Sequence, residues 1–286
     1  MWYLIEFYIG GYKIITKGEV FMKKQVSEAA ADFLFYYLLG VTVKDIEEKD
    51  EKNIVNKCVA RAYLDMSRTL KFSETSEADV KKEIERKRKD FCEEVCESIV
   101  NKVLGMLKEL SGLPSDKMAE EFDKKHAEIC KCVKETAEKF PGYEKEYILE
   151  KIENKYKAED EEDQCFYYGQ AQKWVNMTIK YMWITRKWDT QFENLLPFLH
   201  VPVDSYIIEA VWNHKGWEDV LKAVIIKDKT GKYSSEKVIP WSRWNQCQYT
   251  YFQKKLREKL TNEKPNPIEW EGQAWIEIAK ARASES

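Results

Sequence analysis

Apolar residues recur every three or four positions along most of the chain, and this spacing predicts helices. The pattern is clearest in residues 45–70, where Ile54, Cys58, Ala62 and Met66 fall on one face of a helix. Further helices are expected at 25–39 with Ser27 as the cap, 76–110, about 117–140, 166–186, 204–214, 240–261 and 271–282.

One β element is expected in this helical chain. In residues 222–239 a turn around Thr230 and Gly231 separates two β-favouring runs, which predicts a short hairpin. The N-terminal stretch MWYLIEFYIGGYKII has three possible interpretations: a short strand, a hairpin, or an extension ahead of the domain. The expected fold class is therefore mostly α, a multi-helix domain with a small β-hairpin.

The best candidate for a domain boundary is the acidic end of segment 143–163. Beyond it the composition changes, because nine of the ten tryptophans lie between positions 174 and 275. We therefore expect a helical N-terminal region at 1–163, with a short extension at 1–21. A second helical region, at 164–286, is expected to carry the functional site.

Nothing in the sequence predicts a membrane span or a disulfide framework. The apolar N-terminus lacks the basic leader of a signal peptide, carries Glu6 and two glycines, and is too short to cross a bilayer. Seven cysteines, an odd number, favour a reducing compartment. We therefore expect a cytoplasmic protein that is not bound to membranes.

Two pairs of potential metal ligands stand at helical spacing, Cys92 with Cys96 and His126 with Cys130. Such spacing is compatible with metal binding, but the chain lacks the two close-spaced cysteine motifs of a zinc site. Small apolar cysteines packed on helix faces are the preferred interpretation. We expect no zinc, no iron–sulfur cluster and no other cofactor.

Charge is distributed unevenly along the chain. The net charge is −3, yet residues 164–286 contain 18 Lys and Arg against 14 Asp and Glu. A mildly basic region is compatible with a polyanionic partner such as DNA. The basic run at 81–91 also suits phosphates, but its interleaved acidic residues favour a solvated helix face.

The helix expected at 166–186 carries lysines among aromatic residues. Lys173 and Lys180 lie seven positions, or two turns, apart, whereas Trp174 and Tyr181 belong to another side. A lysine that aromatic neighbours partly desolvate retains some free amine, which a nucleophile needs. The alternative is a lysine whose stem covers apolar surface while its ammonium reaches water, and spacing by itself favours that alternative.

The segment LHVPVDSYI brings an aspartate to the start of the next helix. Pro202 fixes the backbone and lacks an N–H, so Asp204 falls at the N-cap of the helix at 204–214. A structural cap is the simpler interpretation. The functional interpretation is a carboxylate fixed at a helix N-terminus and facing a lysine of a neighbouring helix.

Together the two segments resemble the archaeal oxoguanine DNA glycosylases, a branch of the helix-hairpin-helix glycosylase superfamily. Members carry a catalytic lysine on a helix, a second lysine two turns later, and further along a Pro-x-Asp that opens another helix. Lys173, Lys180 and Pro202-Val203-Asp204 stand in this arrangement, over about residues 165–215. The Leu-Pro-Gly-Val-Gly hairpin of the superfamily is absent, since FYYGQAQ precedes the lysine.

The resemblance implies excision of a modified base that is flipped out of the duplex into a pocket. Asp204 would stabilise the positive charge that develops on the sugar, and Lys173 would attack the anomeric carbon and form a Schiff base. If Lys173 only contacts DNA, Asp204 would position a water instead. The substrate would be an oxidised purine or another modified base, for example in foreign DNA, where excision would serve antiviral defence.

Several polar and aromatic residues near the expected site are candidates for base or DNA contact. They are Gln172, Asn176, Lys180, His200, Trp241, Arg243 and Trp244. Tryptophan stacks on bases, arginine binds phosphate, and amides bind base edges. Each candidate also has a structural interpretation, because buried polar and aromatic residues are common in protein cores.

Three interpretations of the function therefore remain, and the third is an all-α protein of unrelated function. The first is a DNA glycosylase with Lys173 as nucleophile. The second is a non-catalytic nucleic-acid-binding or interaction protein on a glycosylase-like scaffold. Lys173 and Asp204 close together in an open cleft would favour the enzyme, whereas a buried Lys173 paired elsewhere would favour the binding protein.

Overall fold

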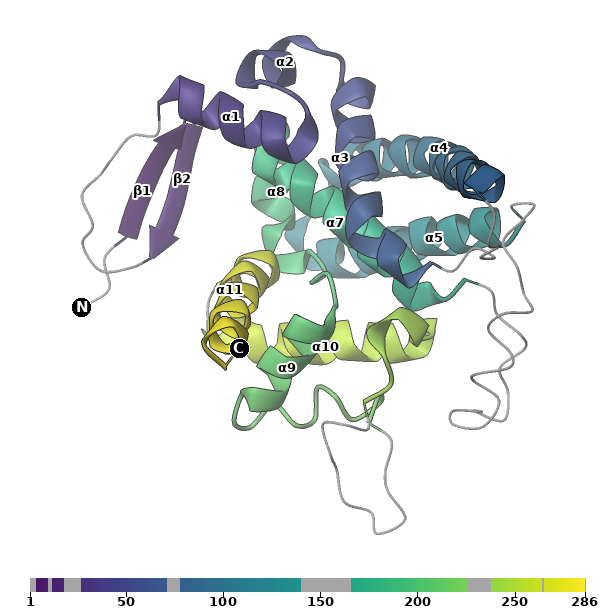
Figure 1. Ribbon diagram of the computed structural model, residues 1–286. Coiled ribbons are helices and arrows are strands. Elements are labelled where there is room, and N and C mark those ends of the chain that lie inside the picture. The colour runs from purple at the N-terminus through teal and green to yellow at the C-terminus, as the bar shows by residue number, and fades with distance from the viewer. Residues whose placement is uncertain are drawn as a thin grey trace.

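The computed structural model describes residues 4–9, 12–17, 27–70, 78–139, 166–225, 238–263 and 265–285. Helices make up most of this part of the chain, which confirms the expected mostly α fold (Figure 1). The α-helices are α1 (Glu28–Leu39), α2 (Val43–Glu48), α3 (Glu51–Met66), α4 (Ala78–Leu110), α5 (Ser115–Lys139), α7 (Tyr168–Thr185), α8 (Asp189–Leu195), α9 (Ser205–Asn213), α10 (Gln246–Glu263) and α11 (Pro267–Glu285). The 3-10 helices are η1 (Ser67–Thr69), η2 (Leu196–Phe198) and η4 (Trp241–Arg243).

Side-chain caps set the bounds of the first helices. Ser27 caps α1 by accepting a backbone hydrogen bond, and Gly40, at a φ of 67°, ends it, as the sequence predicts. Asp50 accepts a hydrogen bond from the N–H of Asn53 and starts α3. The single helix expected at 45–70 is therefore wrong, because this cap separates α2 from α3.

The small hairpin expected at 222–239 is not supported. Residues 226–237 lie outside the described part of the chain, and the flanking residues form one isolated bridge, between Ile225 and Val238. Before the bridge the backbone makes consecutive turns that bury Val220, Leu221 and Val224. These three apolar side chains are buried by turns. The apolar residues before the bridge therefore do not need a strand, in which successive side chains point to opposite faces.

Two short strands precede the helices. β1 (Leu4–Ile9) and β2 (Tyr12–Lys17) pair antiparallel, with Leu4 opposite Lys17 and Ile9 opposite Tyr12. Figure 1 shows this pair beside α1.

The hydrophobic core is built around α7, which packs against α3 and α5. Trp174 of α7 is fully buried, and its indole N–H donates to the carbonyl oxygen of Val59 at 3.0 Å. Its ring lies against the rings of Tyr63 and Phe91. Helices on both sides of position 163 thus share one core, while the boundary itself stays a prediction because residues 140–165 are not described.

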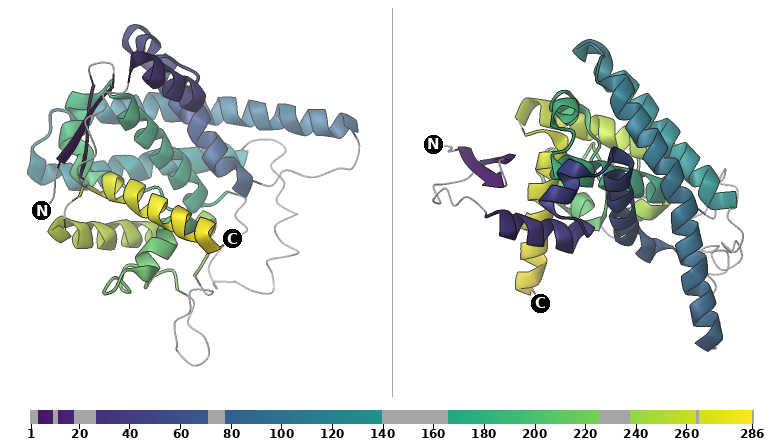
Figure 2. Two further views of the ribbon diagram at one scale, coloured as in Figure 1. Left: turned by 60° about the vertical axis from the view of Figure 1, so that its left-hand side comes forward. Right: turned by 90° about the horizontal axis from the view of Figure 1, so that it is seen from above.

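The long helices α4 and α5 pack against each other along one side of the molecule. Figure 2 shows that the N-terminal end of α4 projects beyond the other helices. The basic run at 81–91 belongs to this projecting end. On the other side of α7, α9 packs against α11.

Among the described helices, none combines the length and apolar character that crossing a bilayer requires. The six cysteines of the described residues are free thiols. Cys92 and Cys96 lie with their sulfur atoms 3.5 Å apart on α4. No group of three or more His, Cys, Asp or Glu side chains suited to a metal ion occurs within the described ranges.

Candidate functional site

The side chains of Lys173 and Asp204 meet in an ion pair. The ammonium Nζ of Lys173 lies 2.9 Å from Oδ2 of Asp204, across 31 positions of sequence. The side chains are 6% and 16% exposed. The expected approach of the two residues is therefore confirmed, and the pair is nearly closed to solvent.

Asp204 is held by the helix that it starts. It is the N-cap of α9 in an extended conformation, and its Oδ1 accepts from the backbone N–H groups of Tyr206 at 3.0 Å and Ile207 at 3.1 Å. One carboxylate oxygen is thus bound by the helix N-terminus, which favours the anion, and the other faces Lys173. The carboxylate is fixed in position by three donors.

The first turn of α7 is held against η4 by a glycine that the sequence analysis did not single out. The N–H of Gly169 donates to the carbonyl oxygen of Trp244 at 2.8 Å. A β-carbon at position 169 would lie 1.9 Å from the carbonyl oxygen of Trp241. A residue with a side chain would therefore push η4 away from the turn that precedes Lys173.

The aromatic candidates near this turn differ in exposure. Trp244 is fully buried, packs against Phe252, and donates its indole N–H to the carbonyl oxygen of Ile239 at 2.8 Å. It is part of the core and has no free face for a base. Trp241 and Arg243 are half-buried in η4.

Lys180 lies two turns after Lys173 but has a different partner. Its ammonium is ion-paired with Glu271 of α11, whose side chain is 2% exposed. Its charge is therefore neutralised within the protein, which weakens it as a phosphate contact.

A ring stack fixes the N-terminus of α9 to α11. The ring of Tyr206 stacks on Trp275 at a centroid distance of 4.8 Å, and the guanidinium of Arg282 lies 4.1 Å from the centroid of the Tyr206 ring. Arg282 is also ion-paired with Glu209. The helix that carries Asp204 at its cap is therefore anchored to its neighbour by aromatic and charged contacts.

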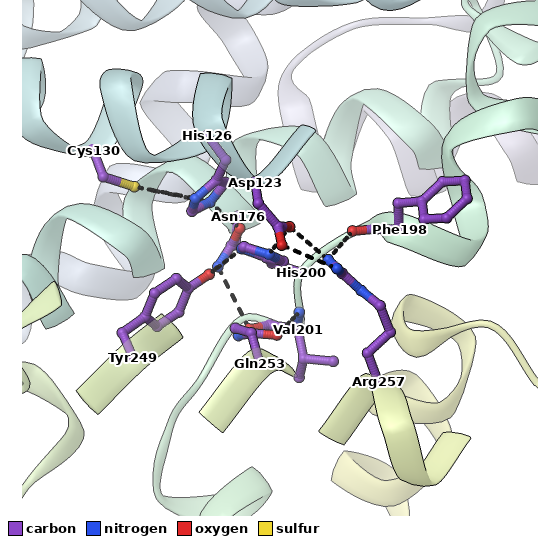
Figure 3. Close-up of polar contacts among 10 residues, drawn as sticks. All are labelled: Asp123, His126, Cys130, Asn176, Phe198, His200, Val201, Tyr249, Gln253 and Arg257. Carbon is purple, nitrogen blue, oxygen red and sulfur yellow. Dashed lines mark hydrogen bonds and ion pairs between the residues drawn. The ribbon is translucent and has the colours of Figure 1, made fainter. Parts of the chain in front are cut away.

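Three further candidates lie in a buried polar network rather than at an open surface, and Figure 3 shows two of them, Asn176 and His200. Gln172, Asn176 and His200 are at most 6% exposed. The network also contains residues that the sequence analysis did not select: Asp123, Tyr249, Gln253 and Arg257. Their polar atoms are bound within the protein, so base contact would require breaking these bonds.

Asn176 is the centre of this network. Its Oδ1 accepts from Nε2 of His126 at 2.7 Å, and its Nδ2 donates to Oε1 of Gln172 at 2.9 Å and to the hydroxyl of Tyr249 at 2.8 Å. The Tyr249 hydroxyl then donates its own proton to Nδ1 of His200 at 2.9 Å. An amide nitrogen only donates and the Asp123 carboxylate only accepts, so Nε2 of the neutral His200 ring is the donor and its Nδ1 accepts from Tyr249.

His200 links the network to a carboxylate near the surface. With Nδ1 as acceptor, Nε2 carries the proton and donates to Oδ1 of Asp123 at 2.8 Å. Arg257 donates to both oxygens of the same carboxylate. The row of Asp123, His200 and Tyr249 has the order of a catalytic triad, but the Tyr249 hydroxyl is buried and cannot reach a substrate.

Burial decides the charge state of these groups. It lowers the pKa of His126 well below its usual value and also lowers the pKa of His200, so both rings are neutral near pH 7. Burial would raise the pKa of the Asp123 carboxyl, but the hydrogen bonds from His200 and Arg257 outweigh it and lower that pKa. Burial raises the pKa of the Tyr249 hydroxyl, which stays protonated.

A separate pocket of about 450 Å³ lies at the other end of α9. It is lined by Trp212, Glu218, Asp219, Leu221, Lys222 and Ile225. Neither Lys173 nor Asp204 belongs to its lining, so this pocket is not the one expected to receive a flipped base beside Lys173 and Asp204.

No protein-family profile, no curated protein and no solved structure matches the chain. In the arrangement of Lys173 and Asp204, the amine can act as a nucleophile, the carboxylate at the helix N-terminus can stabilise a cation, or the two can form a structural ion pair.

Proposed function

We propose that this protein is a cytoplasmic DNA glycosylase that excises a modified base. The observation that supports the proposal is the ion pair between Lys173 and Asp204, in which the carboxylate is fixed at the N-cap of α9. The pairing agrees with the resemblance of these segments to helix-hairpin-helix glycosylases. DNA is the proposed partner.

In this proposal Lys173 supplies the nucleophile. Its ammonium gives up a proton, which ends on the departing base, so that the Asp204 carboxylate, 2.9 Å away, keeps its charge. The amine then attacks the anomeric carbon, the glycosidic bond breaks, and its electron pair leaves with the base. Opening of the sugar ring gives a Schiff base, from which β-elimination cleaves the strand.

Asp204 has the second role. As the glycosidic bond lengthens, positive charge develops on the sugar, and a carboxylate held by fixed donors stabilises it without reorganising. If Lys173 does not form the covalent bond, Asp204 positions a water and the enzyme only removes the base. In both versions the substrate is an oxidised purine or another modified base, including one in foreign DNA.

The burial of the pair defines a requirement of this proposal. Lys173 is 5% exposed, so the groups around it must move apart before a sugar can approach. The same burial favours a second candidate, a non-catalytic nucleic-acid-binding or interaction protein in which the pair only joins α7 to α9. The two candidates differ in whether DNA ever reaches the amine.

Borohydride trapping separates the two candidates. The protein is incubated with duplexes that each carry one modified base, in the presence of borohydride, and covalent complexes are resolved by electrophoresis. The glycosylase proposal predicts a complex with at least one duplex and none with the unmodified duplex.

Release of the free base is measured in parallel, because an enzyme that uses water releases the base without a covalent complex. Binding of the same duplexes is measured over a series of salt concentrations. Phosphate contacts should weaken as salt rises. Binding without base release on any duplex would favour the non-catalytic candidate.

A further inference from the structure

The backbone that delivers Asp204 to α9 has no regular secondary structure. Residues 199–204 lie between η2 and α9 and belong to no helix or strand, and Val201, Pro202 and Val203 are buried. Buried backbone N–H and C=O groups need partners, because water cannot reach them. We call Val201–Val203 the approach segment, since it fixes where Asp204 begins the helix.

Gln253 of α10 pairs with the approach segment through both ends of its amide. Its Oε1 accepts from the N–H of Val201 at 3.0 Å, and its Nε2 donates to the carbonyl oxygen of Val201 at 2.7 Å. Figure 3 shows the amide of Gln253 beside the backbone of Val201. One buried side chain thus supplies the two hydrogen bonds that a neighbouring strand would supply.

Gln172 of α7 contacts the same segment one residue before the carboxylate. Its Nε2 donates to the carbonyl oxygen of Gly169 at 2.9 Å and lies 3.4 Å from the carbonyl oxygen of Val203. Asn176 donates to Oε1 of Gln172, which fixes the orientation of that amide. The helix that carries Lys173 therefore also holds the chain that carries Asp204.

From these contacts we infer that Gln253 and Gln172 are positioning residues for the Asp204 carboxylate. The approach segment is held at Val201 from α10 and at Val203 from α7. The carboxylate needs this constraint because its two oxygens serve different donors, the N-terminus of α9 and Lys173. The consequence for base excision rests on the proposed function, whereas the constraint on Asp204 does not.

Gln253→Met tests the inference. Methionine has a similar length but leaves the N–H of Val201 without a partner and its carbonyl oxygen with only the longer contact from Nδ2 of Asn176, at 3.4 Å, so the segment must shift to satisfy them. Hydrogen exchange at the amides of Tyr206 and Ile207 measures the position of Asp204 directly, because both amides donate to its Oδ1. We expect exchange at these two amides to be about tenfold faster, relative to amides of α7 in the same protein.

The matched control is Leu256→Ala on the same helix. Leu256 is buried, and its loss destabilises the core without removing a bond to the approach segment. It should raise exchange throughout the protein and leave the ratio between the α9 amides and the α7 amides unchanged. If the exchange rate of the α9 amides relative to the α7 amides is the same in Gln253→Met as in Leu256→Ala, the inference is overturned.

Gln253→Glu provides a second variant that keeps the shape of the side chain. An ionised carboxylate accepts from the N–H of Val201 but repels its carbonyl oxygen, whereas a protonated carboxyl donates to it. Exchange at Tyr206 and Ile207 should therefore be faster than in the wild type near pH 8 and approach the wild-type value near pH 5, each pair compared at one pH. No difference from the wild type at either pH would also overturn the inference.

Base excision gives an independent readout. If the wild type excises a base, Gln253→Met should lower the rate of excision while duplex affinity stays near wild type, because Gln253 is buried away from any phosphate. If neither the wild type nor the variant excises a base, the proposed function is wrong. The exchange ratio still decides whether Gln253 positions Asp204.

Discussion

Lys180 and Glu271 form an ion pair in which the carboxylate is almost fully buried. Two turns earlier on the same helix, Lys173 is paired with Asp204 instead. Two lysines of α7 thus have separate carboxylate partners, one from α11 and one from the cap of α9. Variants of the two pairs should therefore separate structural stability from chemistry.

Replacement of Lys180 should affect stability more than chemistry. Lys180→Gln leaves the buried carboxylate of Glu271 without its counter-charge, which costs about 3 kcal/mol when a buried pair is broken. Urea denaturation measures this loss. Borohydride trapping by the folded variant should remain, and its disappearance would identify Lys180 as the amine that reacts.

Replacement of Lys173 should abolish the covalent complex. Lys173→Gln keeps length and polarity but removes the amine, so no Schiff base can form. DNA affinity should stay close to wild type, because only one positive charge is lost. Lys215→Gln, which removes an exposed charge, is the control for that loss. Trapping that survives Lys173→Gln would contradict the assignment of the nucleophile.

Replacement of Asp204 should slow excision without abolishing the helix cap. Asparagine can still accept from the N–H groups of Tyr206 and Ile207. It lacks the charge that stabilises the sugar cation, so we expect a loss of excision of about a hundredfold or more. The variant should fold with a lower Tm, because Lys173 loses its counter-charge in a buried site. Excision at the wild-type rate would rule out the electrostatic role.

A methyl group at Gly169 should disturb the contact between α7 and η4. The new β-carbon would lie 1.9 Å from the carbonyl oxygen of Trp241, so the backbone of η4 must move. We expect Gly169→Ala to lower the free energy of unfolding by about 1–3 kcal/mol. Gly105→Ala on α4 is the control, because its β-carbon meets nothing within 4 Å and should be neutral or stabilising.

Stability should fall on mild acidification. His126 and His200 are neutral in the folded protein because burial lowers the pKa of both rings, while in the unfolded chain they titrate near pH 6.5. The unfolded state therefore binds more protons below about pH 6.5, and each histidine can remove at most about 1.4 kcal/mol per pH unit. Stability from this source is complete above that pH and is lost as pH falls toward the folded-state values.

Urea denaturation of wild type and His126→Gln at pH 7.5 and pH 5.5 checks this expectation. The fall in the free energy of unfolding between the two pH values should be smaller in the variant, which has one buried ring fewer to protonate. An equal fall in both proteins would assign the acid sensitivity to other groups, among them the His200 ring, whose pKa burial also lowers.

Helix content and the central pair were predictable because both depend on local rules. Apolar spacing identifies the helices, and Pro202 followed by Asp204 identifies a cap. Helix bounds were less predictable where a second cap lay inside a periodic run. Asp50 divides the run at 45–70, and the run at 240–261 begins as η4 before α10 starts at Gln246.

The polar network was not predictable because its members are distant in sequence. His200 lies 77 positions from Asp123, and Arg257 lies 134 positions from the same carboxylate. No periodicity relates them. Gln172 and Asn176 were selected as base contacts, but a sequence does not distinguish an amide that is satisfied in the core from one that is open to a ligand.

The shared core has a consequence for a chain cut between α5 and α7. Trp174 from the second fragment would still have its place among Val59, Tyr63 and Phe91 of the first. Two polypeptides made separately should therefore recombine into a non-covalent heterodimer, since each alone would expose the apolar surface that the other covers. Lys173 and Asp204 would both belong to the second polypeptide. The helices α3 and α5, which pack against α7, would belong to the first.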